Sequence, residues 1–162
     1  MTTVGTQCNP LLAALLPIGY FRPVAKNCCY WSGIGCNAED GTVGSIGLPA
    51  SGLAGAIPDL SALSRLRSLD LSSNLLNGTI PTFESLTGLK QLVLNDNLLT
   101  GPVPNLDHLS QLAVLRLENN ALSGSIAAVP HPSDECKLFP QRAQSLCIDS
   151  AIQLAQWYWW QC

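Results

Sequence analysis

The sequence contains an internal repeat of 23 residues, and this repeat constrains the fold more than any other feature of the chain. Three copies are LDLSSNLLNGTIP at 69–81, LVLNDNLLTGPVP at 92–104 and LRLENNALSGSIA at 115–127, and a more divergent copy, IGLPASGLAGAIP, occupies 46–58. Leucine recurs at positions 48, 71, 94 and 117, a polar residue at 51, 74, 97 and 120, and glycine at 55, 78, 101 and 124. Columns that stay in phase over residues 46–127 indicate a stack of equivalent structural units.

Within a unit, leucines alternate with other residues at a period of two, which predicts a short strand with one buried face. An asparagine then ends the strand, as at Asn74, Asn97 and Asn120. Because its side chain both donates and accepts, we expect it to satisfy backbone groups that a tight turn leaves unpaired in the core. Further leucines recur every three residues, at 86, 89 and 92, which predicts a 3₁₀-like return segment on the outer side.

No single unit can bury its own leucines, so neighbouring units must stack. The composition agrees, because 28 of the 162 residues are leucine while 13 glycines and 11 prolines interrupt the backbone, which favours short units over long helices. The predicted fold class is an α/β solenoid of four 23-residue repeats, with parallel strands on its concave face. Capping segments are required at both ends, because a solenoid exposes apolar faces there. The predicted domains are an N-terminal cap at 1–42, the repeats at 43–127 and a C-terminal cap at 128–162.

The repeat resembles the plant-type extracellular leucine-rich repeat, whose signature is LxxLxLxxNxLxGxIP. The resemblance covers Val43 to Ile126, and the segments NGTIP and TGPVP separate this subtype from intracellular ones. The family's usual unit is one residue longer, and the missing residue here lies between Pro81 and Phe83. The resemblance implies a non-catalytic extracellular recognition module, similar to a receptor or co-receptor ectodomain, that binds a protein or peptide through its concave strands.

The N-terminal segment 8–36 resembles the cap of polygalacturonase-inhibiting proteins, because CNP, an adjacent cysteine pair and WSGIGC all recur there. That resemblance implies the disulfides Cys8–Cys28 and Cys29–Cys36, with Trp31 covering the first strand's leucines. A helix is predicted at 10–16, capped by the asparagine at position 9 and ended by the proline at 17. A zinc site made by three of these cysteines and a histidine is the rival interpretation. Adjacent ligands without a C-x₂-C pair suit zinc poorly, so we predict no metal and no other cofactor.

The segment after residue 127 leaves the repeat. Cys136 and Cys147 are predicted to form a third disulfide, and residues 141–160 have the pattern of an amphipathic helix. The terminal run Trp157-Tyr158-Trp159-Trp160 either packs within the cap or forms an interface for a partner, a sugar or a membrane surface. Cys162 is left over from the count of seven cysteines and is either free or paired with another chain.

Seven cysteines in a chain of this size indicate an oxidising compartment, so we expect a secreted protein or one at the extracellular face of the plasma membrane. The triplet Asn77-Gly78-Thr79 is an N-glycosylation sequon, which agrees with secretion and predicts a glycan on Asn77. No apolar run approaches the roughly 20 residues that cross a bilayer, and no signal peptide is visible. Membrane association is therefore expected only through segments outside this chain.

Charge and motif content argue against other functions. A net charge of −3 with 8 basic residues does not suit a nucleic-acid partner. His108 lies in a predicted outer segment and His131 in a turn, and neither has a nucleophile and an orienting group arranged as a triad. Asp70, Asp96 and Glu118 lie on the strand side, but a glycosidase would need its paired carboxylates in an enclosing cleft. We therefore predict that the protein is not an enzyme.

Binding is expected where the strand residues between the leucines point outward. Four strands about 4.8 Å apart give a patch of roughly 300 Å², well below the about 800 Å² that each partner buries in a stable interface. The concave face should thus bind weakly alone or share its ligand with a second protein. The alternative hypothesis is an inhibitor of a secreted cell-wall hydrolase, although the inhibitors it resembles have more repeats. The predicted ligand-binding residues are Ser68, Asp70, Ser72, Gln91, Val93, Asn95, Asp96, Val114, Arg116, Glu118 and Asn119.

Overall fold

The computed structural model describes residues 8–20 and 27–123. The predicted C-terminal cap, with Cys136, Cys147, its helix and the tryptophan run, lies outside these residues, as does His131. None of the helices in the described part is long and apolar enough to cross a membrane. The helical elements are α1 (Cys8–Leu15), η1 (Leu16–Ile18) and η2 (Cys28–Tyr30). The strands are β1 (Ile34–Cys36), β2 (Val43–Gly47), β3 (Ala54–Ala56), β4 (Ser68–Asp70), β5 (Leu75–Gly78), β6 (Gln91–Val93), β7 (Leu98–Pro102), β8 (Val114–Arg116) and β9 (Ala121–Ser123).

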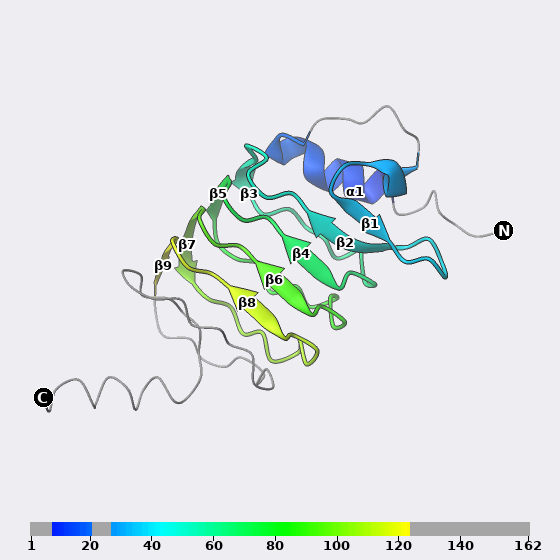
Figure 1. Ribbon diagram of the computed structural model, residues 1–162. Helices are drawn as coiled ribbons and strands as arrows, with labels where there is room; N and C mark the ends of the chain where they lie inside the picture. The colour runs from blue at the N-terminus through cyan, green and yellow to red at the C-terminus, as the bar shows by residue number, and fades with distance from the viewer. Residues whose placement is uncertain (1–7, 21–26, 124–162) are drawn as a thin grey trace, which may run out of the picture.

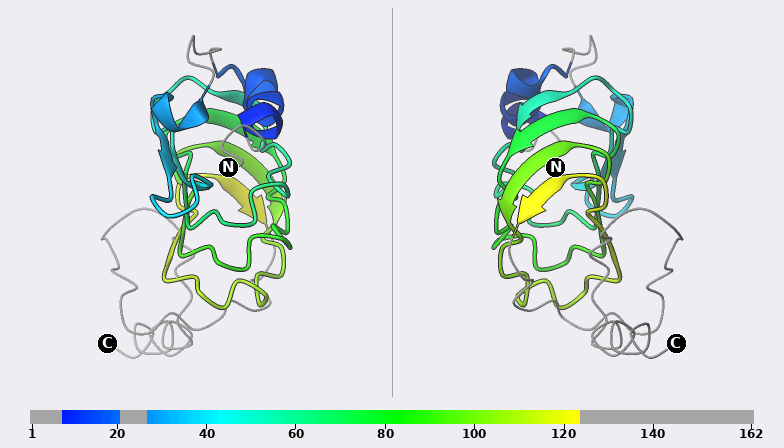
Figure 2. Two further views of the ribbon diagram at one scale, coloured as in Figure 1. Left: turned by 90° about the vertical axis from the view of Figure 1, so that its right-hand side faces the viewer. Right: turned by 90° about the vertical axis from the view of Figure 1, so that its left-hand side faces the viewer.

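The chain folds into a solenoid whose coils stack one on another from the N-terminal end, where α1 lies (Figure 1 and Figure 2). The main sheet has the order β1-β2-β4-β6-β8, and every pair after β1-β2 is parallel. In register, Ser45 pairs with Ser68, Ser68 with Gln91 and Gln91 with Val114, each 23 residues further on. The leucine-rich-repeat stack predicted from the repeat is confirmed.

A second sheet, with the order β3-β5-β7-β9, runs along the coils and was not expected from the sequence. Its strands β5, β7 and β9 begin directly after Asn74, Asn97 and Asn120, whereas β3 follows Ser51 in the first coil. Its strands are parallel, and Gly78 at the end of β5 and Gly101 within β7 have positive φ angles of 75° and 77°, which glycine adopts without steric cost. Each coil therefore has two hydrogen-bonded walls rather than one.

The return segments that close each coil are successive turns with one hydrogen bond every three residues. In the second coil, Leu86 N donates to Phe83 O at 2.9 Å and Leu89 N donates to Leu86 O at 2.8 Å. The same pairs of bonds close the return segments of the first coil, through Leu63 and Leu66, and of the third. The 3₁₀-like spacing predicted for this segment is thus present as separate turns, without a continuous helix.

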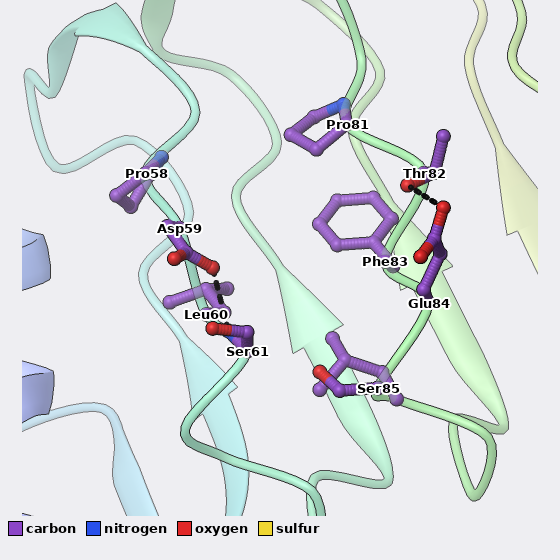
Figure 3. A pocket seen from close by; sticks show the side chains of 10 residues that line it. Pro58, Asp59, Leu60, Ser61, Pro81, Thr82, Phe83, Glu84 and Ser85 are labelled. Atoms are coloured by element: carbon purple, nitrogen blue, oxygen red, sulfur yellow. Dashed lines mark hydrogen bonds between the residues drawn. The ribbon is translucent and has the colours of Figure 1, made fainter.

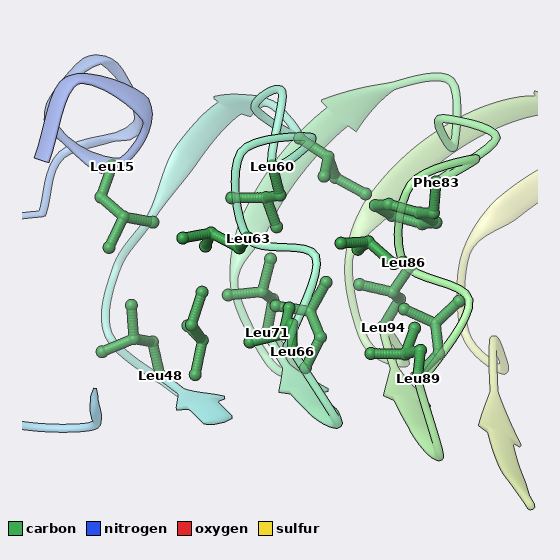
Figure 4. Close-up of a cluster of buried hydrophobic side chains, with 14 of the residues drawn as sticks. Leu15, Leu48, Leu60, Leu63, Leu66, Leu71, Phe83, Leu86, Leu89 and Leu94 are labelled. Carbon is green, nitrogen blue, oxygen red and sulfur yellow. The ribbon is translucent and has the colours of Figure 1, made fainter. Parts of the chain in front are cut away.

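The core is a column of leucines between the main sheet and the return segments (Figure 4). The strand leucines meet the return leucines of the same coil, and Leu69, Leu71, Leu86, Leu89 and Leu92 are all fully buried. Each such side chain stabilises the fold by about 1.5–3 kcal/mol relative to an exposed one. Because every coil buries its leucines against the next, no coil has a complete core by itself.

The N-terminal cap closes the first coil. It contains the disulfides Cys8–Cys28 and Cys29–Cys36, which is the pairing that the resemblance implied. Trp31 is buried in the same core cluster as Ile46 and Leu48 of the first repeat. The predicted helix at 10–16 is shifted: α1 starts at Cys8 and ends at Leu15, so Asn9 is inside it rather than at its cap. The proline at 17 lies in the separate 3₁₀ turn η1, which begins at Leu16, because proline lacks the N–H that an α-helix interior requires.

Candidate functional site

The candidate site is the outward-facing side of the main sheet, which we call the strand face. Its centre consists of the residues that alternate with the buried leucines in β4, β6 and β8. Because the strands pair in parallel, equivalent residues lie beside one another in rows across the sheet. One row is Ser68, Gln91 and Val114, and the next is Asp70, Val93 and Arg116. The structure therefore brings these six predicted residues together on one surface.

The remaining predicted residues follow the strands, where hydrogen bonds between coils continue. Asp96 N donates to Glu118 O at 3.0 Å, and Ser73 N donates to Asn95 O at 2.9 Å. Ser73, Asp96 and Asn119 all have left-handed backbone, with φ angles of 55°, 56° and 54°. Aspartate and asparagine tolerate this conformation better than most residues. The inter-coil bonds and the repeated left-handed residue extend the ordered surface beyond the strand ends.

Side-chain hydrogen bonds orient several groups on the strand face. Ser68 Oγ donates to Gln91 Oε1 at 3.0 Å across neighbouring coils. The Asp96 carboxylate accepts from the side-chain amides of Asn95 and Asn119, so one carboxylate links two coils. These contacts hold the polar side chains in defined positions before any partner arrives.

Ser72 differs from the expectation of an outward-facing binding residue. It is only 8% exposed, and its hydroxyl donates to Asp70 Oδ1 at 2.7 Å while its backbone N–H donates to the same oxygen at 3.0 Å. Its contacts therefore position Asp70 and leave little of Ser72 available to a partner. The alternation of residues predicted that Ser72 points outward. That prediction is wrong, because the chain begins to turn inward directly after the strand.

The strand face is predominantly acidic. Asp70, Asp96 and Glu118 carry negative charge there, and Arg116 carries positive charge in the last described coil. The carboxylates lie on an open sheet face. Within residues 8–20 and 27–123, no group of three or more histidine, cysteine, aspartate or glutamate side chains is arranged to hold a metal ion.

The side chains of Asn74, Asn97 and Asn120, which we call the asparagine ladder, form hydrogen bonds beneath the strand face. Asn97 Nδ2 donates to the carbonyls of Leu71, Leu94 and Asn95 at 3.0–3.2 Å, and its Oδ1 accepts from Leu76 N at 3.0 Å. Asn74 and Asn120 make the corresponding contacts in their own coils. Each asparagine bonds backbone groups of its own coil, as expected for the turn, and also of the preceding coil, which the sequence analysis did not predict.

Two other predicted residues lie away from the strand face. Asn77, the sequon asparagine, is exposed in β5 of the second sheet, and its glycosylation stays a prediction. His108 is half-buried in the return segment between β7 and β8, with no carboxylate or hydroxyl bonded to its Nε2 in the described part of the chain. The return segments also hold a pocket that the sequence analysis missed, because its residues do not repeat from coil to coil.

Comparison with known proteins gives matches over most of the described residues. A family model described as Leucine Rich Repeat matches residues 65–86. No curated protein matches the sequence. A chain in the crystal structure of the BIR3–SERK2 complex from Arabidopsis thaliana is 33% identical, with a TM-score of 0.63, over 71% of this chain and 70% of that one.

Two further solved structures are similar. The leucine-rich-repeat ectodomain of the receptor kinase SOBIR1 from Arabidopsis thaliana is 27% identical, with a TM-score of 0.66, over 75% of this chain and 71% of that one. The ectodomain of the Arabidopsis receptor kinase HAESA, in complex with a peptide hormone ligand, is 35% identical with a TM-score of 0.58. That match covers 62% of this chain and 18% of HAESA, so this chain corresponds to a small part of the longer receptor.

Proposed function

Because this chain belongs to the plant-type extracellular leucine-rich-repeat proteins, we propose that it is a non-catalytic extracellular module that binds a protein or peptide through the strand face. The observation that carries the proposal is the set of polar side chains that differ from coil to coil yet stand in register on one hydrogen-bonded sheet. Core packing needs the leucines and asparagines of the repeat, but it does not need these particular charges and amides. A rigid surface with pre-oriented polar groups loses little conformational entropy on binding.

The similar structures support a protein or peptide partner. One is a complex of two proteins, and another contains a peptide hormone bound to a receptor ectodomain. The acidic charge of the strand face favours a ligand with positive charge, because complementary charge increases the association rate and excludes unsuitable partners. Arg116 lies at one end of this surface. It favours a ligand that carries a negative group there in addition to its positive charge.

The small area of the strand face limits the affinity of the module. The main sheet offers roughly 300 Å², less than half of the about 800 Å² that each partner of a stable interface buries. We therefore expect dissociation constants in the micromolar range or weaker for this chain alone. A second protein that contacts the same ligand would supply the missing area, as a co-receptor does.

Peptides selected from a random display library against the whole chain provide a direct test. The affinity of each peptide is measured by calorimetry for the parent chain and for Asp96→Ala, Arg116→Ala and Thr100→Ala. We expect at least one of the two strand-face substitutions to weaken binding about tenfold or more, because a few residues carry most of the energy of an interface and arginine is common among them. Thr100 lies in β7 of the second sheet and serves as the matched control.

Two results would contradict the proposal. One is a failure to enrich any peptide. The other is a set of peptides that bind the Asp96→Ala and Arg116→Ala variants as tightly as the parent chain. Nanomolar affinity for the isolated chain would contradict the expectation of a shared ligand but not the location of the site.

The alternative function is inhibition of a secreted cell-wall hydrolase. One observation favours it: the N-terminal cap has the cysteine pairing that the resemblance to polygalacturonase-inhibiting proteins implied. The test is the residual activity of a purified polygalacturonase after addition of the chain. A dose-dependent loss of activity that the Asp96→Ala variant abolishes would favour the inhibitor. Unchanged activity at a large molar excess would exclude inhibition of that enzyme.

A further inference from the structure

A pocket of about 360 Å³ lies between the return segments of the first two coils, outside the strand face. One wall comes from the segment after β3 and the other from the segment after β5 (Figure 3). Its volume is near the lower end of the about 300–1,000 Å³ range of small-molecule sites, so it suits a single side chain or a small ligand. The lining residues are Pro58, Asp59, Leu60, Ser61, Pro81, Thr82, Phe83, Glu84, Ser85 and Leu86.

The pocket occurs where the second coil departs from the turn that its neighbours use. In the first and third coils, Asp59 Oδ1 accepts from Ser61 N and Asn105 Oδ1 accepts from Asp107 N, both at 2.8 Å. The equivalent residue of the second coil is Thr82, and the next residue, Phe83, has left-handed backbone with a φ of 55°. This backbone is uncommon for an aromatic residue. Figure 3 shows the Phe83 ring projecting from its own coil towards the segment of Pro58 and Leu60.

The pocket combines an apolar floor with an acidic rim. Leu60, Phe83 and Leu86 are buried, while Asp59 and Glu84 are exposed on opposite walls. The lining contains no lysine, arginine or histidine, so nothing within it neutralises the two carboxylates. Hydrogen bonds from the backbone N–H and the hydroxyl of Ser61 hold the pKa of Asp59 below its ordinary value, and Asp59 therefore stays ionised in mildly acidic solution.

Ser85 adds an unused polar group to this lining. Its Oγ is shielded from solvent and has no hydrogen-bond partner among the described residues. A buried hydroxyl without a partner costs free energy, so such groups are rare in folded proteins.

We propose that this pocket receives an arginine side chain presented by a protein partner. The methylene stem lies on the apolar floor of Leu60 and Phe83, as long cationic side chains do on apolar surfaces. The guanidinium group has five N–H donors in a planar fork, which lets one group bond the carboxylates of both walls, Asp59 and Glu84. A lysine ammonium is compact and more strongly hydrated, and it bridges separated acceptors less well.

The proposal adds a second contact point to the module. The pocket belongs to segments 58–61 and 81–86, which follow the second sheet, whereas the strand face belongs to the main sheet. A partner in the pocket and a ligand on the strand face therefore use different residues of the same coils. Simultaneous binding would supply contact area that the strand face lacks.

The test uses small probes and the whole chain, labelled with ¹⁵N. Nα-acetyl-arginine methylamide is titrated while backbone amide shifts are followed by NMR, and the corresponding citrulline and lysine compounds serve as matched probes. We expect saturable shifts confined to residues 58–61 and 81–86 for the arginine probe, with millimolar affinity because one side chain supplies few contacts. The citrulline and lysine probes should bind at least fivefold more weakly.

Variants separate the proposed contacts from general effects. Asp59→Asn combined with Glu84→Gln should weaken arginine binding at least tenfold, whereas Ser85→Ala should leave it unchanged, because the Ser85 oxygen is shielded from solvent. All three positions tolerate these changes, because the two carboxylates are exposed and the Ser85 hydroxyl has no partner to lose. Asp70→Asn, on the strand face, should leave arginine binding unchanged.

Three outcomes would overturn the proposal. They are no saturable shifts with the arginine probe, equal binding of the arginine and citrulline probes, and arginine binding that survives the double substitution. Peptide binding to the strand face is measured separately. Its loss or survival therefore leaves the result for the pocket unaffected.

Discussion

At the scale of single residues, the asparagine ladder has the greatest structural consequence, because each member satisfies backbone groups of two coils. Asn97 is 6% exposed and is bonded to four backbone groups. Its burial keeps most of the side chain out of contact with solvent. The ladder therefore couples the stability of one coil to the position of the next.

Substitution of Asn97 tests this coupling. We expect Asn97→Ala to lower the free energy of unfolding by at least about 3 kcal/mol, because each buried polar group left unpaired costs about 1–3 kcal/mol. Asn77→Ala is the matched control, since Asn77 is exposed in β5, and it should change stability by no more than about 0.5 kcal/mol in unglycosylated protein. Urea denaturation measures both. A loss below about 1 kcal/mol for Asn97→Ala would mean that the ladder contributes little.

The turn before β2 provides a residue-scale prediction about pH. Asp40 Oδ1 accepts from the Thr42 hydroxyl at 2.6 Å and from Thr42 N at 2.9 Å, and these bonds lower the pKa of Asp40. Because the folded-state pKa is below the unfolded one, this contribution to stability is present above about pH 4. It is lost as the pH falls through the lowered folded-state value.

Replacing the hydroxyl group should reverse much of this shift. In Thr42→Val, we expect the pKa of Asp40 to rise towards its ordinary value, because the largest cause of the shift is the side-chain hydrogen bond. NMR titration of the aspartate carboxyl carbons measures the change. The pKa of Asp59, which is lowered by Ser61 instead, should stay the same in this variant. Identical Asp40 titrations in the two proteins would disprove the assigned cause.

At the scale of elements, the coil is the interchangeable unit of this molecule. Strand pairs β2-β4, β4-β6 and β6-β8 share one register, and the leucine turns and asparagines recur with them. Interactions in such a stack are mainly between nearest neighbours. Removing one whole coil should therefore preserve the contacts of the coils that become adjacent.

Deletion of residues 69–91 tests this interchangeability, because it joins Ser68 to Leu92 with the repeat in phase. We expect a folded protein with a strand-type circular dichroism spectrum, cooperative unfolding and a lower Tm, since one layer of leucines is lost. The variant should also lose arginine-probe binding, because the wall of Phe83 and Glu84 is gone.

Deletion of residues 69–88 is the matched control. It removes 20 residues, breaks the phase of the repeat and should prevent folding. Equal stability of the two deletion variants would show that the phase of the repeat does not determine how the coils stack.

At the scale of the whole molecule, the periodic part of the structure could be predicted and the rest could not. The strands, the buried leucines and the asparagine ladder follow from residue types that recur at one spacing. The second sheet escaped prediction, because its segments, such as Leu75–Gly78, carry few β-branched or alternating apolar residues and pair through backbone groups of adjacent coils.

Some features of the candidate sites could likewise be predicted from the sequence, and others could not. Alternation places Asp70 and Arg116 on one surface, but it does not show that Ser72 is turned inward to bond Asp70. The pocket depends on the left-handed backbone of Phe83 in one coil and on the path of its neighbour. Such a feature arises from the difference between two coils, which a pattern of shared positions does not reveal.

The antiparallel pairing of β1 with β2 has a consequence for how this architecture grows. A strand that runs the opposite way blocks that side of the sheet, so duplication of a coil there would meet the wrong hydrogen-bond pattern. Duplication of a coil is therefore compatible with the sheet only on the other side of β2, where the pairing is parallel. The first coil would then keep its place beside β1, and added coils would extend the binding surface away from it.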